Sequence, residues 1–112
     1  MTRRTAVITT SWDDGHVLDA RLAALLKKYN LPATFYIAPK NREFSQSELL
    51  SRKEIKALAK DFEIGSHTMT HPVLTTLSDK EIEKELLQLW YVRDDEGTWI
   101  LEVTRHCDTG LF

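Results

Sequence analysis

The chain of 112 residues is long enough for one domain with a single hydrophobic core. Its composition, 42% hydrophobic and 29% charged, is that of a folded globular protein and argues against an intrinsically disordered chain. The net charge of −2, with acids and bases interleaved, excludes the basic patch that a nucleic acid or an anionic membrane would require. No apolar stretch is long enough to span a membrane, and no signal peptide is recognisable, so the sequence predicts a cytoplasmic protein.

The first part of the chain predicts a strand, a helix and a second strand. Residues 6–11 include an apolar run typical of a short buried strand, and residues 33–38 are rich in β-branched and aromatic side chains. Between them, residues 17–29 repeat apolar side chains on one helical face, and Asn30 followed by Pro32 ends the helix. That face consists of Val17, Leu18, Leu22, Leu25, Leu26 and Tyr29.

Two further helices are marked by capping boxes, in which a serine and a glutamate three residues later bond each other's backbone N–H groups. Ser51–Glu54 opens the first of these helices, and Ser78–Glu81 opens the second. Residues 62–66 lie between the two helices and predict a third strand. The apolar sides comprise Ile55, Leu58, Ala59 and Phe62 in the first helix and Ile82, Leu86, Leu89 and Trp90 in the second.

The strand–helix order occurs three times, which predicts an α/β fold with parallel strands and right-handed crossovers. After Trp90 the pattern changes. Residues 94–97 are a turn signal between β-prone segments, so Tyr91–Val103 predicts an antiparallel hairpin that brings Trp99 inward. We therefore divide the chain into residues 5–90, which carry the strand–helix units, and an atypical tail of residues 91–112.

Chemically active side chains follow the first and third predicted strands. Asp13 and Asp14 are adjacent carboxylates that repel each other, so either the pair lies in a solvated turn or a positive charge lies over it. His67 follows the third strand, and His71 comes four residues later, just before Pro72, which favours a compact turn over a helix. Because the carboxyl ends of parallel strands meet at one edge of a sheet, we expect these four side chains to converge.

Two histidines and one carboxylate form a facial triad, which suits a divalent transition metal and leaves positions open for water and substrate. One aspartate would bind the metal, and the other would remain free to act as a base. Each motif alone is weak, because Asp-Asp-Gly is usually a plain turn and paired surface histidines are common. The metal-site hypothesis depends on their joint placement after alternate strands.

The same residues resemble the motifs of the polysaccharide deacetylases, the NodB-homology domain. Thr10–His16 (TSWDDGH) is similar to the family's T-F-D-D-G motif, and His67–Pro72 (HTMTHP) is similar to its H-S/T-x-x-H-P motif. Ala33–Ile37 resembles the family's A-T-F-F-V strand, Glu63–His67 its E-I-G-x-H approach, and Leu74–Glu81 its L-x-x-L-S-x-x-E stretch. The resemblance covers residues 5–88.

The resemblance implies a distorted (β/α) barrel with a metal at its mouth, of which this chain carries the first part. By position it makes Asp13 the catalytic base and makes Asp14, His67 and His71 the ligands of a divalent metal, Zn²⁺ before Co²⁺ or Mn²⁺. The implied activity is hydrolytic removal of acetyl groups from N-acetylated or O-acetylated carbohydrates. For the N-acetylated substrates this is hydrolysis of a carbon–nitrogen bond other than a peptide bond. The implied partner is an acetylated sugar or polysaccharide.

The family's later motifs are not matched. The R-x-P-Y and D-x-x-D-W motifs have no counterpart, and His106 is a poor substitute for the general-acid histidine of the L-x-H motif. A truncated, frameshifted or split gene product would explain this pattern, and we expect weak or no deacetylase activity. Three parallel strands also cannot close a barrel, so an open sheet edge should promote self-association.

Two readings from other classes stay open from the sequence alone. The first is a non-catalytic metal-binding fragment or carbohydrate-binding module of the same lineage, which an acetate-release assay would separate from an enzyme. The second is an iron oxygenase that uses the same kind of triad. The order of the ligands and the lack of a double-stranded β-helix pattern speak against an oxygenase.

Overall fold

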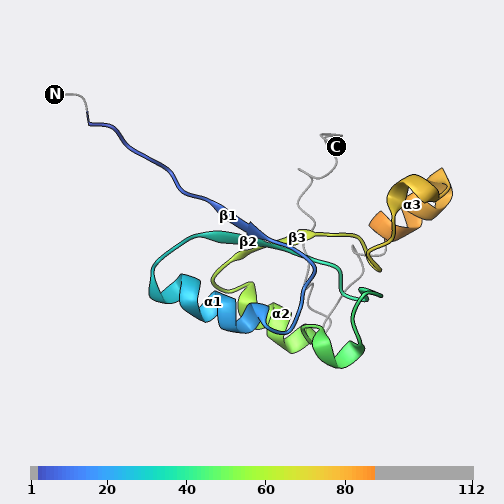
Figure 1. The fold of residues 1–112 in the computed structure, drawn as a ribbon, viewed down its shortest axis with the longest axis horizontal. Coiled ribbons are helices and arrows are strands. Elements are labelled where there is room, and N and C mark those ends of the chain that lie inside the picture. Colours follow the sequence, from blue (N-terminus) through green and yellow to red (C-terminus); the bar gives the residue numbers. More distant parts are fainter. Residues whose placement is uncertain (1–2, 88–112) are drawn as a thin grey trace.

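The computed structural model describes residues 3–87, which form a three-stranded sheet with helices (Figure 1). The strands are β1 (Thr10–Trp12), β2 (Ala33–Ile37) and β3 (Glu63–Ser66), and they lie in the order β1-β2-β3. Both pairings are parallel, with Thr10 opposite Ala33 and Thr34 opposite Glu63. The predicted α/β architecture of parallel strand–helix units is therefore confirmed.

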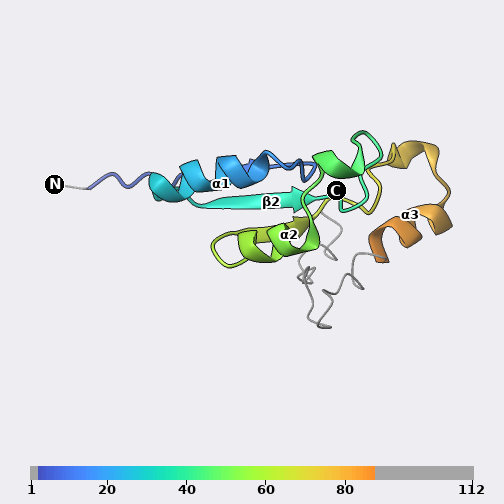
Figure 2. The same ribbon diagram turned by 90° about the horizontal axis from the view of Figure 1, so that it is seen from below.

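Two helices cover one face of the sheet. α1 (Asp19–Lys28) and α2 (Arg52–Leu58) each connect successive strands, and both lie on the same side of the sheet (Figures 1 and 2). Their buried side chains pack against Phe35 and Ile37 of β2, and the Phe35 ring is edge-on to Phe62 with ring centroids 5.4 Å apart. The remaining buried members of this core are Ala23, Leu26, Leu50, Ile55, Leu58 and Met69.

Both predicted capping boxes are present. At the start of α2, Ser51 Oγ accepts the N–H of Glu54 at 3.2 Å, and Glu54 Oε2 accepts the N–H of Ser51 at 2.9 Å. The same reciprocal pair joins Ser78 and Glu81 at the start of α3 (Asp79–Leu87). Just past the end of α1, Asn30 takes the left-handed φ of 52° that stops a helix, as its position in the sequence predicted.

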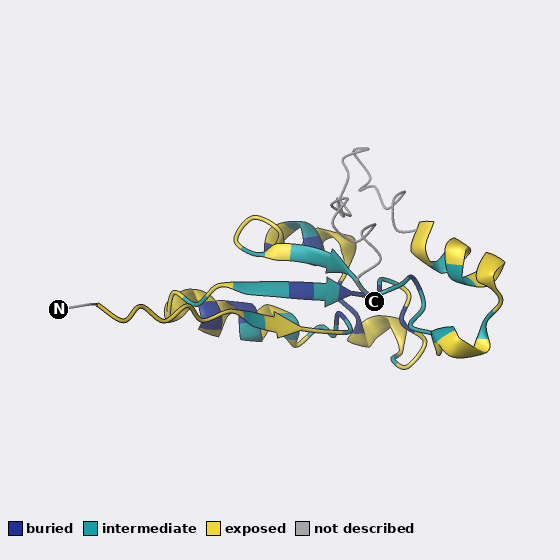
Figure 3. Cartoon of the chain, turned by 90° about the horizontal axis from the view of Figure 1, so that it is seen from above, coloured by how far each residue is buried: buried dark blue, intermediate teal, exposed yellow. Residues whose placement is uncertain are grey.

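The first strand is shorter and less buried than the sequence indicated. The apolar run predicted a buried strand from Ala6, but β1 begins only at Thr10, and Val7 and Ile8 are 89% and 63% exposed. In Figure 3 the described segment nearest the N-terminus is coloured as exposed. The neighbouring strand β2 begins at Ala33, directly opposite Thr10, so the preceding residues have no strand to pair with among the described residues. An apolar run predicts that a strand is present, but the residue at which its pairing begins depends on where the neighbouring strand starts.

The helices also bury less of their apolar faces than predicted. In α1, Leu26 is buried but Leu25 is exposed, and the flanking Leu18 and Tyr29 are exposed as well. α3 has no fully buried residue, and Leu86 is 38% exposed. This helix lies beyond the end of the sheet, away from the core formed by α1 and α2 (Figure 1).

The second face of the sheet carries polar side chains. Directly paired residues of adjacent strands share a face, so Ser11, Thr34 and Glu63 lie together on the side opposite the helices. The Thr34 hydroxyl donates to Glu63 Oε2 at 3.2 Å. This face is therefore more polar than that of a parallel strand buried on both sides.

Some predicted features fall beyond residue 87. Leu89, Trp90 and the expected hairpin at Tyr91–Val103 lie outside the described residues. Between residues 3 and 87, every helix is too short or too polar to cross a lipid bilayer.

Candidate metal centre

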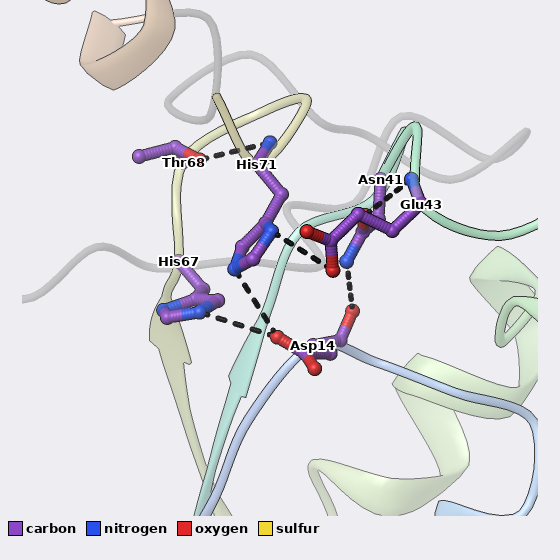
Figure 4. Close-up of polar contacts among 6 residues, drawn as sticks. All are labelled: Asp14, Asn41, Glu43, His67, Thr68 and His71. Atoms are coloured by element: carbon purple, nitrogen blue, oxygen red, sulfur yellow. Dashed lines mark hydrogen bonds and ion pairs between the residues drawn. The ribbon is translucent and has the colours of Figure 1, made fainter. Parts of the chain in front are cut away.

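The carboxyl ends of the three strands meet at one edge of the sheet, and the loop after each strand reaches the same place. The aspartate loop (residues 13–15) follows β1, the middle loop (residues 38–43) follows β2, and the histidine loop (residues 67–71) follows β3. Figure 4 shows side chains from all three loops directed toward one another.

The aspartate loop is a tight turn that aims one carboxylate at both histidines. Asp14 and Gly15 both have a left-handed φ of 82°, and a Cβ at Gly15 would lie 2.8 Å from the Ile37 Cγ2 methyl group. Only glycine fits there, and an aspartate is held in a conformation that side chains seldom adopt. The turn places Asp14 Oδ1 3.4 Å from His67 Nε2 and 3.3 Å from His71 Nε2.

The histidine loop is a compact turn, as predicted, and it brings its two rings together. The His67 N–H donates to the Ile37 carbonyl at 3.2 Å, and the two ring centroids are 4.8 Å apart. His71 is not extended, although the following proline favours that geometry. It takes a φ of 60°, because its N–H donates to Thr68 Oγ1 at 3.1 Å and closes the turn.

A glutamate from α3 holds the middle of the histidine loop. Glu85 Oε2 accepts the N–H groups of Met69 and Thr70 at 3.1 and 2.9 Å, and Glu85 Oε1 accepts the Thr70 hydroxyl at 2.7 Å. The Met69 side chain is buried in the hydrophobic core. The loop is therefore fixed from both sides, through its backbone by a carboxylate and through its side chain by the core.

The three predicted ligands fit a divalent metal. Asp14, His67 and His71 each offer one ligand atom, and these atoms all lie within 4.8 Å of one another. Zinc takes tetrahedral ligands at about 2.0–2.2 Å, so neighbouring ligand atoms lie roughly 3.4 Å apart. The distances of 3.4 and 3.3 Å from Asp14 Oδ1 to the two histidine Nε2 atoms match this spacing. The three side chains are 28–35% exposed, so an ion and a substrate could both reach them.

Two other aspartates near this edge, Asp13 and Asp19, differ in environment. Asp13 is exposed and is not a member of the ligand group. Asp19, at the start of α1, has a buried Oδ2 without a hydrogen-bond partner. Burial raises the pKa of Asp19 to about 6; the charge of His16 lowers this pKa, and the charges of Asp14 and Asp13 raise it.

Sequence reasoning missed the middle loop and Glu85. Asn41 is 2% exposed, and its Nδ2 donates to the Asp14 carbonyl at 3.5 Å. Glu43 Oε2 lies 3.4 Å from His71 Nδ1. Both follow the middle strand at its carboxyl end, so the argument that singled out Asp13 and His67 also applies to them. Nothing in the helical pattern marked Glu85.

Comparison with known proteins identifies the family of this chain. Residues 1–89 match the polysaccharide deacetylase family. The chain belongs to this family. It is 33% identical to peptidoglycan-N-acetylmuramic acid deacetylase PdaC of Bacillus subtilis (strain 168) over 87 residues. The matched region covers 71% of this chain and 16% of the Bacillus protein.

Two solved deacetylases resemble the fold. The chitin deacetylase from the fungal pathogen Colletotrichum lindemuthianum is 30% identical with a TM-score of 0.61, and the match covers 73% of this chain and 36% of that chain. Streptococcus pyogenes deacetylase PplD, solved in complex with acetate, is 25% identical with a TM-score of 0.60 and is matched over 67% of this chain and 34% of that chain. The chain therefore spans about a third of each solved relative.

Proposed function

We propose that this chain is a metal-dependent deacetylase that removes acetyl groups from N-acetylated or O-acetylated carbohydrates. The observation that supports this most is the convergence of Asp14, His67 and His71 at the carboxyl edge of the sheet, with Asp13 next to Asp14 in the chain. The relatives support the substrate class, because they are named as deacetylases of peptidoglycan and of chitin. The bond cleaved in an N-acetylated sugar is a carbon–nitrogen bond outside a peptide.

Asp14 Oδ1, His67 Nε2 and His71 Nε2 are the atoms that would hold the metal, which we take to be Zn²⁺, with Co²⁺ or Mn²⁺ as alternatives. When bound, such an ion lowers the pKa of water to near neutral and polarises a carbonyl oxygen. Neutral imidazoles and an ionised carboxylate suit this role. The left-handed turns at Asp14 and His71 hold the donor atoms in place before any ion arrives.

Asp13 is the residue we assign to proton transfer. It is next to a ligand in the chain, it is exposed, and it is outside the ligand group, so its carboxylate is free to accept a proton from the attacking water. The ligand side chains are 28–35% exposed, so a substrate could reach them from solvent. In this proposal Asp14 binds the metal and Asp13 accepts the proton.

The test combines zinc content with acetate release. The purified chain should bind one zinc and release acetate only slowly from acetylated chito-oligosaccharide or O-acetylated xylan, because the family's later motifs are not matched. His67→Ala and His71→Ala should lose most of the zinc, whereas His16→Ala should keep it, because His16 lies outside the ligand group.

Each alternative has its own outcome. Zinc bound without acetate release on either substrate would favour the non-catalytic metal-binding reading. A wild-type chain that binds no zinc under metal-replete conditions would overturn the metal site itself.

A further inference from the structure

The candidate ligands belong to a closed ring of contacts that passes through the middle loop (Figure 4). Asn41 Nδ2 donates to the Asp14 carbonyl at 3.5 Å, and Asn41 Oδ1 accepts the N–H of Glu43 at 2.9 Å. Glu43 Oε2 lies 3.4 Å from His71 Nδ1, and His71 Nε2 lies 3.3 Å from Asp14 Oδ1. The ring therefore starts and ends at the same aspartate.

The middle loop is also tied to the histidine loop through its backbone. The N–H of Lys40 donates to the Met69 carbonyl at 2.9 Å, and the N–H of Arg42 donates to the Thr70 carbonyl at 3.1 Å. These two bonds fix the register between the loops. They bring the residue after Arg42, which is Glu43, alongside His71. Asn41 is buried while its two neighbours are exposed, so it points the opposite way, toward Asp14.

His71 Nδ1 is the atom in this ring of contacts whose partner bears on metal binding. It is buried and has no hydrogen bond in the structure, and Glu43 Oε2 is the acceptor that faces it. The 3.4 Å separation is that of an ion pair, slightly longer than a hydrogen bond. The Glu43 side chain is 59% exposed, so a small rotation would close the gap. A metal-binding histidine commonly donates its second ring N–H to a carboxylate, which fixes the tautomer and the ring orientation.

We propose that Glu43 is a positioning residue of the metal centre. It accepts the Nδ1–H of His71 and so keeps Nε2, with its lone pair, directed at the metal position beside Asp14. Asn41 holds the middle loop to the aspartate loop and so sets the distance between Glu43 and the metal ligands. This inference rests on the proposed metal site. It assigns Glu43 no contact with metal or substrate.

Zinc affinity of the full chain tests the proposal. We expect Glu43→Ala to weaken zinc binding by about 10–100-fold in a chelator competition, the usual effect of removing such a partner. Glu43→Gln keeps an acceptor oxygen but loses the charge, so its loss should be smaller. Glu83→Gln, which removes one exposed carboxylate from α3, is the matched control and should bind zinc like the wild type.

A second measurement separates positioning from folding. In the zinc-loaded wild type, the His71 Nδ1–H should give a slowly exchanging, downfield proton signal, and Glu43→Ala should lose it while melting like the wild type in EDTA. Equal zinc affinity and an unchanged signal in Glu43→Ala would overturn the inference and leave the proposed function intact. Equal losses in Glu43→Ala and Glu83→Gln would also overturn it, because the effect would then be one of net charge. A wild type that binds no zinc would overturn both.

Discussion

At the scale of single residues, the adjacent Asp13 and Asp14 lie in two different environments within one turn. Asp14 is half-buried with its Oδ1 between two imidazoles, whereas Asp13 is exposed beside it. We expect Asp13→Asn to keep its zinc and to slow acetate release by roughly 10²–10⁴, the usual contribution of a general base. Zinc content and turnover should be measured on the same preparation. Loss of the metal instead would mean that the two aspartates exchange roles.

Asp19 should make the metal-free fold sensitive to pH. Burial raises its pKa to about 6, so the stability linked to its protonated form is fully present below its ordinary pKa and is lost as the pH rises through the folded-state value. Asp19→Asn stays neutral and lacks this loss. Between pH values of about 4 and 7, the free energy of unfolding of Asp19→Asn should therefore rise relative to that of the wild type.

Urea unfolding of both chains in EDTA, at several pH values, measures this difference. The EDTA removes metal, whose charge would alter the field around Asp19. Parallel pH profiles for the two chains would show that Asp19 is solvated in the folded state.

The residue scale also marks a limit of sequence reasoning about the site. Residue type and spacing brought together Asp13, Asp14, His67 and His71, because adjacent acids and paired histidines are conspicuous. Asn41 and Glu43 escaped notice, since a lone asparagine or glutamate in a loop is common. Their importance comes from the two backbone bonds that align the loops, and no sequence pattern encodes those.

At the scale of elements, α3 acts as a support for the histidine loop rather than as a layer of the core. Its Glu85 accepts three hydrogen bonds from that loop, but the helix has no buried residue. Glu85→Ala leaves the N–H groups of Met69 and Thr70 without their acceptor, which should cost about 1–3 kcal/mol. Amide hydrogen exchange at these two residues should accelerate, and zinc binding should weaken.

Glu83→Ala is the natural control for that experiment. It sits on the same helix, is exposed, and should change neither exchange nor metal affinity. If Glu85→Ala behaves like Glu83→Ala, the carboxylate does not hold the loop in solution.

Elements were predicted best where their signals are local. Ser51 with Glu54 and Ser78 with Glu81 define helix starts through bonds three residues apart, and Asn30 stops a helix through its own backbone. The extent of burial was predicted less well. It depends on which elements lie opposite, as the exposed Leu25 of α1 and Val7 before β1 show.

At the scale of the whole molecule, β1 is bordered on one side only by β2 within the described residues, and the segment before it is apolar and exposed. We expect the chain to self-associate through this edge, because an open edge next to apolar side chains pairs readily with another copy. Sedimentation velocity should show a mass above that of one chain that rises with concentration.

Ile8→Lys should reduce this association, since a charge on an edge prevents strand pairing. Val73→Lys changes an equally exposed apolar residue remote from β1 in the sequence and should leave association unchanged. A wild-type chain that stays monomeric at all concentrations would contradict the prediction.

The placement of the ligands on the first and third loops has a consequence for how the chain folds. An ion held by Asp14 and His67 would close a loop of about fifty residues, and restricting the unfolded chain in this way stabilises a fold by roughly 4 kcal/mol in the chain-entropy treatment of cross-links. The metal would then act as a non-covalent staple that spans the entire sheet. Zinc should raise the melting temperature of the wild type steeply and that of His67→Ala hardly at all, so thermal stability would report occupancy of the site without any substrate.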